Sequence, residues 1–310
     1  MNTPVNLVIF ASREDLATIT RTLLSAISAV PHSSIIDIIV NGNLHLAEAI
    51  HSFCSHGIAG ESKQVNVWQI ATADKANAWN QHIHDIWRGD IDSIYIDGYV
   101  RIEKNSISSI SRTLSSSQSV IGTSGVPTAG VSAKQQRLKI KKHGGFHGNL
   151  CAIKASALSE IRRRKIHIPN GMYRVDSTMG AFLSFGLDNT INEWSPSTFI
   201  PFTAEASWEL DKRKWYRFKD IIAWHHRRRR QARGDIENAA IKFHLNNMQL
   251  LPESIPKDIR SLVINYSSRC PRDSRRIVNS SRRHYRAFQY ILAYEIPAKS
   301  TMIARQISSC

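Results

Sequence analysis

Apolar and polar positions along the first hundred residues predict strands and helices in strict alternation. Short runs of apolar and β-branched residues predict strands at 6–11, 34–40, 64–71 and 93–96. Apolar residues that recur every three or four positions predict helices at 13–30, 44–57 and 74–89. Strands and helices in this order form a largely parallel sheet with helices on its faces.

The pattern is weaker after residue 100, and the chain becomes more helical and more basic. It predicts a helix at 107–117, a loop with a β-rich segment at 120–149, a strand and a helix within 150–165, a helix at 175–186, an extended stretch at 192–204, a long basic helix at 207–248 and a further helix near 282–296. The predicted fold is therefore α/β, with a Rossmann-like, mostly parallel sheet. We divide it into residues 1–225 and a basic, mainly helical C-terminal region, 226–310.

Polar residues follow each of the four predicted strands of the first part. Ser12 and Arg13 follow the first, Asn41 the second, Lys75 the third and Asp97 the fourth. In open sheets of this kind the ligand lies beyond the carboxyl ends of the strands. A carboxylate at the end of a buried strand costs free energy unless it is hydrated, hydrogen-bonded or facing a cation. The pattern therefore predicts a ligand at this edge of the sheet, with Asp97 facing it.

The charge is large and unevenly distributed. The net charge of the 310 residues is +16, yet residues 1–100 carry 5 Lys and Arg against 10 Asp and Glu. Residues 101–310 therefore carry a net charge of +21. A surplus on this scale favours an anionic partner, which could be nucleic acid, anionic lipid or a phosphorylated substrate; a solvated basic surface is the plainer alternative.

Composition narrows the class of protein further. Hydrophobic residues make up 42% of the chain, enough for a core, and no apolar run of 18 or more residues predicts a membrane span. The N-terminal stretch lacks the basic and apolar regions of a signal peptide. The four cysteines are scattered, with no C-x-x-C pair, which indicates a reducing compartment and no zinc site. We expect a cytoplasmic protein, with attachment to an anionic membrane as an open alternative.

Seven segments between residues 5 and 235 carry motifs whose order and spacing match one enzyme family. They are "VIFASREDLATITRTLLSAI" (8–27), "IDIIVNGN" (36–43), "ADKANAWNQHI" (73–83), "IYIDGYV" (94–100), "HGNLCAIKASAL" (147–158), "VDSTMGAFLSFG" (175–186) and "RRRRQARG" (227–234). Together they resemble the family 2 glycosyltransferases of the GT-A fold.

The resemblance implies an inverting hexosyltransferase that moves a sugar from a nucleotide-sugar donor, UDP-linked, to an acceptor that the sequence does not identify. It implies donor contacts from Ala11, Ser12, Arg13, Asp15, Asn41, Asp74, Lys75 and Asp97. It implies phosphate contacts from Arg227, Arg230 and Arg233. Asp176 aligns with the general base, which takes the proton of the attacking acceptor group.

Departure of a nucleoside diphosphate requires positive charge, usually that of a divalent cation on hard oxygen ligands. The resemblance implies Mn²⁺ or Mg²⁺ at Asp97. The second Asp of the D-x-D motif is Tyr99 here, so Asp97 is the only carboxylate of that motif. Val175 likewise replaces the acid that usually precedes the base, and Asn41 replaces an Asp after the second strand.

Two other classes of function compete with this one. A non-enzymatic nucleic-acid binder is supported by a pI near 10.0 and by arginine clusters at 162–164, 227–230, 275–276 and 282–283. No helix-turn-helix, zinc-finger or RNP-like motif accompanies them, so nucleic acid ranks below a nucleotide-sugar. A nucleotidyltransferase ranks lower, because the loop after the first strand has no glycine. The plain alternatives for Asp97 and Asp176 are a turn residue and a helix cap.

Overall fold

The computed structural model describes residues 3–57, 63–128, 133–211 and 218–309. The first part alternates as predicted: β1 (Asn6–Ala11), α1 (Leu16–Ala29), β2 (Ile35–Asn41), α2 (Leu44–Gly57), β3 (Gln64–Ile70), α3 (Lys75–Gln81) and β4 (Ser93–Asp97). A π-helical turn, His82–Ile86, extends α3. Strand β1 pairs in parallel with β2 and with β4, and β2 pairs in parallel with β3. The predicted parallel sheet is therefore confirmed.

The middle of the chain adds the second half of the sheet. It contains β5 (Arg101–Ile102), α4 (Ser106–Leu114), β6 (Gly122–Pro127), α5 (Ala133–His143), β7 (Cys151–Ile153), α6 (Ala155–Arg163), α7 (Val175–Ser184), α8 (Pro196–Phe199) and β8 (Phe202–Glu209). The loop with a β-rich segment predicted at 120–149 contains β6, as expected, but it was wrong in part, because it also contains the helix α5. The helix predicted from residue 207 was also wrong at its start, since β8 continues to Glu209. Residues 212–217 of that prediction lie outside the described residues.

The last part is mainly helical. It contains α9 (Phe218–Lys242), a π-helical turn (Phe243–Asn247), a 3-10 turn (Pro252–Ser254), α10 (Ile259–Arg269), α11 (Pro271–Val278), α12 (Arg282–Leu292), a second 3-10 turn (Ala298–Thr301) and β9 (Arg305–Ser309). The predicted division between residues 225 and 226 falls inside α9. None of the helices in the described ranges combines the length and the hydropathy that crossing a bilayer requires.

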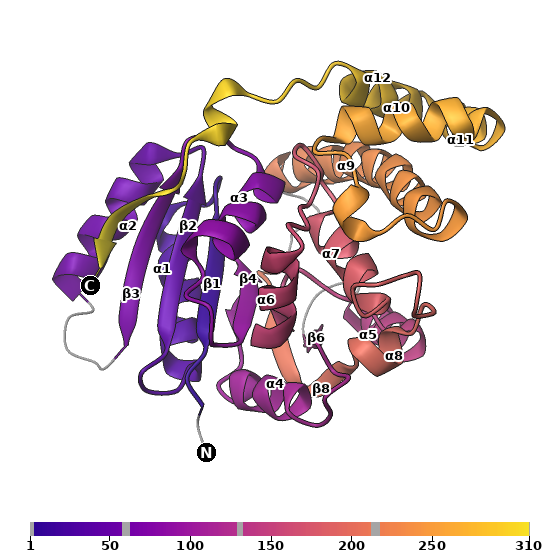
Figure 1. The fold of residues 1–310 in the computed structure, drawn as a ribbon. Helices are drawn as coiled ribbons and strands as arrows, with labels where there is room; N and C mark the ends of the chain where they lie inside the picture. The colour runs from indigo at the N-terminus through magenta and orange to yellow at the C-terminus, as the bar shows by residue number, and fades with distance from the viewer. Residues whose placement is uncertain (1–2, 58–62, 129–132, 212–217, 310) are drawn as a thin grey trace.

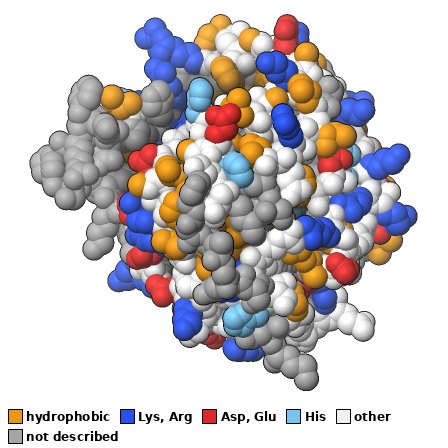
Figure 2. Space-filling model, turned by 90° about the vertical axis from the view of Figure 1, so that its left-hand side faces the viewer, with side chains coloured by type: hydrophobic (Ala, Val, Ile, Leu, Met, Phe, Trp, Pro, Cys, Tyr) orange, Lys and Arg blue, Asp and Glu red, His pale blue; other side chains and the backbone are white. Residues whose placement is uncertain are grey.

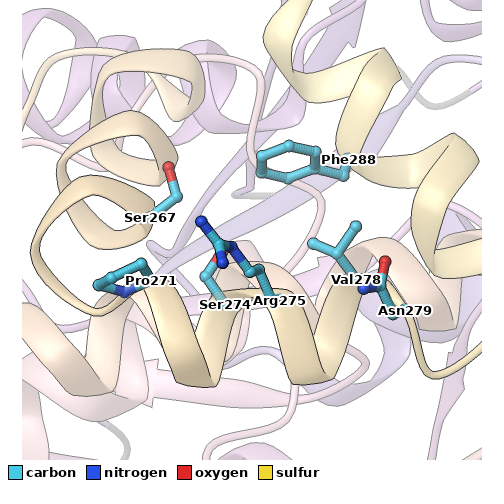
Figure 3. A pocket seen from close by; sticks show the side chains of 7 residues that line it. All are labelled: Ser267, Pro271, Ser274, Arg275, Val278, Asn279 and Phe288. Atoms are coloured by element: carbon cyan, nitrogen blue, oxygen red, sulfur yellow. The ribbon is translucent and has the colours of Figure 1, made fainter.

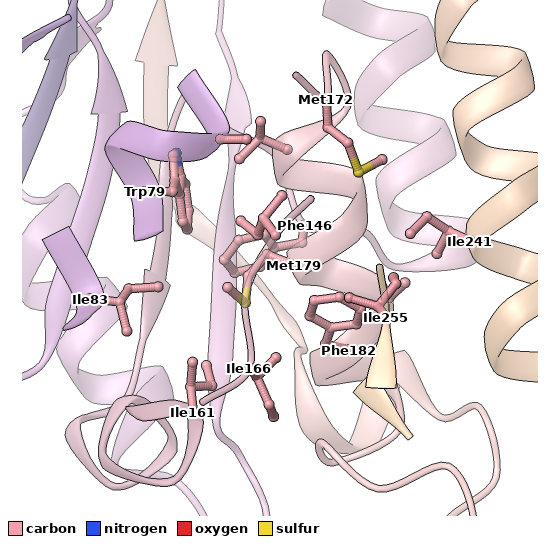
Figure 4. Close-up of a cluster of buried hydrophobic side chains, with 14 of the residues drawn as sticks. Trp79, Ile83, Phe146, Ile161, Ile166, Met172, Met179, Phe182, Ile241 and Ile255 are labelled. Carbon is pink, nitrogen blue, oxygen red and sulfur yellow. The ribbon is translucent and has the colours of Figure 1, made fainter. Parts of the chain in front are cut away.

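The described strands form one nine-stranded sheet in the order β5-β8-β6-β7-β4-β1-β2-β3-β9. Helices pack on the faces of this sheet, and α9 to α12 gather beyond one side of it (Figure 1). Strand β1 is buried along its whole length, as expected of a central parallel strand covered on both faces. Two clusters of buried apolar side chains lie against the sheet. One of them joins Trp79 of α3, Ile161 of α6, Phe182 of α7 and Ile241 of α9 (Figure 4).

The chain returns to the sheet at its C-terminal end. Strand β9 pairs antiparallel with β3, and the segment that leads to it runs across the top of the molecule from α12 (Figure 1). The predicted helical C-terminal region did not include this strand. Its five residues, "RQISS", carry too little apolar pattern to signal a strand, and the pairing depends on the open edge that β3 offers.

A buried carboxylate holds α9 against the start of α7. The side chain of Glu237 is fully buried and accepts hydrogen bonds from the backbone N–H groups of Tyr173 and Arg174, at 3.0 and 2.8 Å. It also forms an ion pair with Arg233, one turn earlier in α9, at 2.7 Å. A carboxylate in this position is stable only because each of its oxygens has donors. Glu237 therefore fixes the basic helix next to the helix that carries Asp176.

Replacement of Glu237 by Ala should lower the free energy of unfolding by about 3 kcal/mol, because it leaves a largely buried cation and two partly buried N–H groups without their partner. Urea unfolding followed by circular dichroism measures the change. Glu295 is exposed and serves as the matched control, since Glu295→Ala should stay within about 0.5 kcal/mol of the parent. Equal unfolding midpoints for the two variants would contradict this role.

Candidate functional site

Asp97 and Lys75 meet at the carboxyl edge of the parallel strands. Asp97 ends β4, and Lys75 begins α3 after β3. Their side chains form an ion pair, and the Asp97 carboxylate also accepts a hydrogen bond from the Tyr99 hydroxyl at 2.8 Å. The Lys75 ammonium lies 6.0 Å from the centroid of the Phe10 ring. The Asp97 side chain is 13% exposed and that of Lys75 is 33% exposed, so the pair is accessible from one side.

The backbone around this pair explains the glycine of the D-G-Y sequence. A Cβ atom on Gly98 would lie 2.6 Å from Ile19 and 3.0 Å from the Phe10 carbonyl oxygen, and the Gly98 N–H donates to that carbonyl at 2.8 Å. Only glycine permits so close an approach of the two strand ends. Asp97 and Tyr99 are therefore held at a fixed distance from β1.

Hydrogen bonds join the loops after β1 and β2 at the same edge of the sheet. Asn41 is buried and donates from Nδ2 to the Ala11 carbonyl oxygen at 2.9 Å. Asn43 donates to the Ser12 carbonyl oxygen, also at 2.9 Å. Gly42 between them has φ of +72°, a conformation that favours glycine. Sequence reasoning placed Ser12 and Asn41 at one edge, and the structure brings their loops together there.

Asp176 lies in the first turn of α7 and is the least engaged carboxylate of the site. Its carboxylate accepts one hydrogen bond, from the Gly148 N–H at 3.1 Å. Burial raises the pKa of Asp176, but the positive charge of Lys75 and the hydrogen bond from the Gly148 N–H hold the pKa below its usual value. Burial in turn lowers the pKa of Lys75, and the carboxylates of Asp97 and Asp176 outweigh it, so the pKa is raised. Lys75 and Asp176 thus share one electrostatic environment, in which both stay charged at neutral pH.

His147 lies next to this group, and sequence reasoning missed its part. The backbone N–H of His147 donates to the Ser124 hydroxyl oxygen at 2.7 Å. The imidazole ring contacts Gln136 and lies 5.3 Å, between centroids, from the ring of Trp208. Burial lowers the pKa of His147, although the carboxylates of Asp176 and Asp97 oppose this. The imidazole is therefore neutral at physiological pH. The signal was present in the matched segment that begins at residue 147.

Two predicted donor contacts serve as helix caps in the structure. Asp15 caps α1 and accepts from the Thr18 N–H at 2.8 Å, and these bonds from Thr18 lower the pKa of Asp15. Asp74 caps α3 and accepts from the backbone N–H groups of residues 76 and 77. It also accepts from the Gly171 N–H at 2.7 Å and from the Tyr294 hydroxyl at 3.2 Å. A role of either carboxylate in donor binding stays a prediction.

The predicted phosphate-binding arginines lie along α9. Arg227 is exposed, and the guanidinium of Arg230 lies 5.9 Å from the centroid of the Tyr173 ring. Arg233 is engaged by Glu237, as described above. Arg174, which sequence reasoning did not single out, precedes α7, and its buried Nε has no hydrogen-bond partner among the described residues. Arg13 follows β1, and its backbone N–H donates to the Glu14 carboxylate at 2.9 Å.

The protein side chains at this edge fit a divalent cation only together with a phosphorylated ligand. Within the described ranges, no three His, Cys, Asp or Glu side chains gather in a way that could hold a metal ion. Asp97 offers one carboxylate, whose two oxygens bond Lys75 and Tyr99, so a cation would replace one of these partners. Mg²⁺-type ions are commonly bound by one or two carboxylates with the phosphates of the substrate. The donor set of this site agrees with that arrangement.

The comparisons with known proteins agree on the fold. No family model and no curated protein matches the chain. Among solved structures, the mannosyltransferase PcManGT from Pyrobaculum calidifontis, in complex with GDP-Man and Mn²⁺, is similar with a TM-score of 0.57 and 12% identity, over 93% of this chain and 84% of that chain. TarS 1-349 of S. aureus, in complex with UDP-GlcNAc, is similar with a TM-score of 0.51 and 8% identity, over 94% and 80% of the two chains.

Both structures are GT-A-type glycosyltransferases. The chain therefore has the GT-A-type fold, a largely parallel central sheet flanked by helices, which confirms the fold class predicted from the sequence.

Replacement of Lys75 by Met should lower the free energy of unfolding by about 1.5–3 kcal/mol, because it leaves the partly buried Asp97 carboxylate without its charged partner. A double-mutant cycle with Asp97→Asn measures the coupling, and the double variant should be less destabilised than the sum of the two single variants. Denaturant unfolding of the four proteins provides the values. Strict additivity would show that the two side chains do not interact in solution.

Proposed function

We propose that the chain is a glycosyltransferase of the family 2 type, which transfers a hexose from a UDP-linked donor with inversion. The observation that carries the proposal is the ion pair of Lys75 and Asp97 beyond the carboxyl ends of the parallel strands in a GT-A-type fold, with Asp176 near enough for its charge to raise the pKa of Lys75. Ligands bind at this edge in open α/β sheets. A cation, a carboxylate beside it and a second, ionised carboxylate are the groups that sugar transfer from a nucleotide requires.

The donor nucleotide would lie across the loops after β1 and β2. Ser12 and Asn41 supply polar groups there, and Ala11, Arg13 and Asp15 flank the same loop. Asp74 would act indirectly, because its carboxylate holds α3 and Lys75 in place.

The donor diphosphate would face Lys75. Its ammonium neutralises the charge that develops on the leaving diphosphate oxygen as the bond from that oxygen to the anomeric carbon breaks. A divalent cation, when bound, would add positive charge to the diphosphate, and Asp97 is the side chain that would hold it. Tyr99 remains a hydrogen-bond donor to Asp97, because the Asp97 charge raises the pKa of the phenol.

Asp176 would accept the proton of the attacking acceptor hydroxyl. Other acids of the neighbouring segment are less suited. Asp211 and Glu209 form ion pairs with Arg101, at 2.6 and 2.8 Å, and Glu205 is exposed on β8. Asp176 has no ion pair among the described residues and stays ionised at neutral pH, as a general base must be.

The acceptor would approach from the side of α9. Arg227 and Arg230 lie on this helix, which Glu237 holds next to the start of α7. Arginines so placed suit an acceptor that carries phosphate.

Replacement of Asp97 by Ala should weaken UDP binding and abolish transfer, because it removes the carboxylate that would hold the divalent cation at the diphosphate. Isothermal titration with UDP, with and without Mn²⁺, measures the binding, and a chelator should reduce the UDP affinity of the parent protein. Asp90 is exposed, so Asp90→Ala is the matched control and should bind UDP normally. Unchanged UDP affinity and turnover in Asp97→Ala would overturn the donor site.

Replacement of Asp176 by Asn should lower the transfer rate by about 10²–10⁴-fold while donor affinity stays nearly unchanged, since the amide keeps the shape but not the proton affinity. UDP release measures the rate, and titration measures donor affinity. Glu205→Gln, an exposed acid nearby, is the control and should retain activity. Normal turnover in Asp176→Asn would place the base elsewhere, and unfolding of the variant would make Asp176 a structural cap.

A further inference from the structure

The surface of α11 and α12 is strongly basic. Six exposed arginines lie on these helices: Arg272, Arg275, Arg276, Arg282, Arg283 and Arg286. Among the described residues only Arg276 of this set forms an ion pair, with Asp273 at 3.3 Å. The face over α2 and β9, by contrast, shows Lys and Arg interspersed with Asp and Glu (Figure 2). Helices α11 and α12 therefore carry a dense group of arginines that this other face lacks.

A cavity of about 260 Å³ opens within this basic surface, between α10, α11 and α12. Its polar wall is formed by Ser267, Ser274, Arg275 and Asn279. Figure 3 shows the Arg275 side chain reaching from α11 into the space between Ser267 and Phe288. Ser274 is buried and belongs to the wall of this cavity.

These groups together suit an oxyanion. A guanidinium without a carboxylate partner can bind phosphate through two parallel N–H bonds, and hydroxyl and amide groups beside it can donate further bonds. The cavity is smaller than the roughly 300–1,000 Å³ of sites for drug-sized ligands, so it suits a phosphate with a small substituent better than a nucleotide-sugar. Val278 and Phe288 form an apolar wall for the carbon atoms of such a substituent.

Exposed aromatic and aliphatic side chains on the same helices favour a lipid over a free anion. Tyr285 and Tyr290 on α12 are 52% and 59% exposed, and Ile264 on α10 is 42% exposed. Exposed aromatic and aliphatic side chains among arginines are typical of surfaces that contact the headgroup region of a membrane. We propose that α10, α11 and α12 bind an anionic membrane surface, with the phosphate of a lipid headgroup in the Arg275 cavity. This site is separate from the edge that holds Lys75 and Asp97, and the inference does not depend on sugar transfer.

Sedimentation of the full chain with vesicles tests the proposal without any donor or turnover. Vesicles of phosphatidylcholine and phosphatidylglycerol should bind the parent protein, and vesicles of phosphatidylcholine alone should not. Arg275→Gln should lower the partition coefficient on anionic vesicles by about fivefold, the equivalent of ~1 kcal/mol for one cation at an anionic surface. Arg112 is an exposed arginine on α4, so Arg112→Gln removes the same charge elsewhere and should bind as the parent does.

Further arms separate the lipid from other anions. A double variant, Arg282→Gln with Arg283→Gln, should also bind anionic vesicles less tightly. It changes only exposed side chains, so the test remains possible even if Arg275→Gln does not fold. If Arg275→Gln and Arg112→Gln lose the same amount of vesicle binding, the effect is one of net charge, and the cavity is not the lipid site. If the parent ignores anionic vesicles, the proposal fails; thermal stabilisation by inorganic phosphate would then assign the cavity to a free anion, and Arg275-dependent binding of random DNA would assign it to nucleic acid.

Discussion

The ion pair between Lys75 and Asp97 is the contact on which the candidate site depends. Each charge would cost free energy at the partly buried edge of the sheet if the other were absent. Together they are stable, and the sheet fixes them, because one ends β4 and the other begins the helix after β3. A donor diphosphate would find a cation already in position, with little reorganisation needed as charge develops.

A second set of buried polar contacts determines what lies opposite this pair. Glu237 holds the start of α7 against α9, and Asp74 joins the cap of α3 to Gly171 and to Tyr294 beyond α12. These bonds connect the helical C-terminal region to both helices that carry charged groups of the site. Strand β9 adds a further attachment at the far edge of the sheet. The position of Asp176 relative to Lys75 therefore depends on contacts with the C-terminal region, and a substitution in α9 should change the geometry of the site.

The sequence predicted the parallel half of the sheet well, because local pattern decides it. β1 and β2 are apolar runs, and α1 has a regular apolar face, so their order alone implied a ligand edge with Asp97 on it. Contacts between distant residues left no such signal. Asp74 reads as a helix cap, yet two of its partners lie 97 and 220 residues away.

The same limit applies elsewhere in the chain. The short strand β9 and the unpartnered Nε of Arg174 depend on which distant elements pack together, and spacing along the chain does not reveal that. His147 lay in a segment that matched a motif, but its neutral state follows from burial, which only the folded chain creates.

The most direct test of the central claim is a thermal-shift screen of the purified chain against nucleotide-sugars, with and without Mn²⁺ and with random DNA as the competing anion. A ligand that binds only the folded state raises the melting temperature in proportion to the logarithm of its concentration over its Kd. The expected result is stabilisation by UDP-linked sugars, increased by Mn²⁺ and lost in Lys75→Met. Stabilisation by DNA alone, with no response to any nucleotide-sugar, would contradict the assignment of this edge to a glycosyl donor.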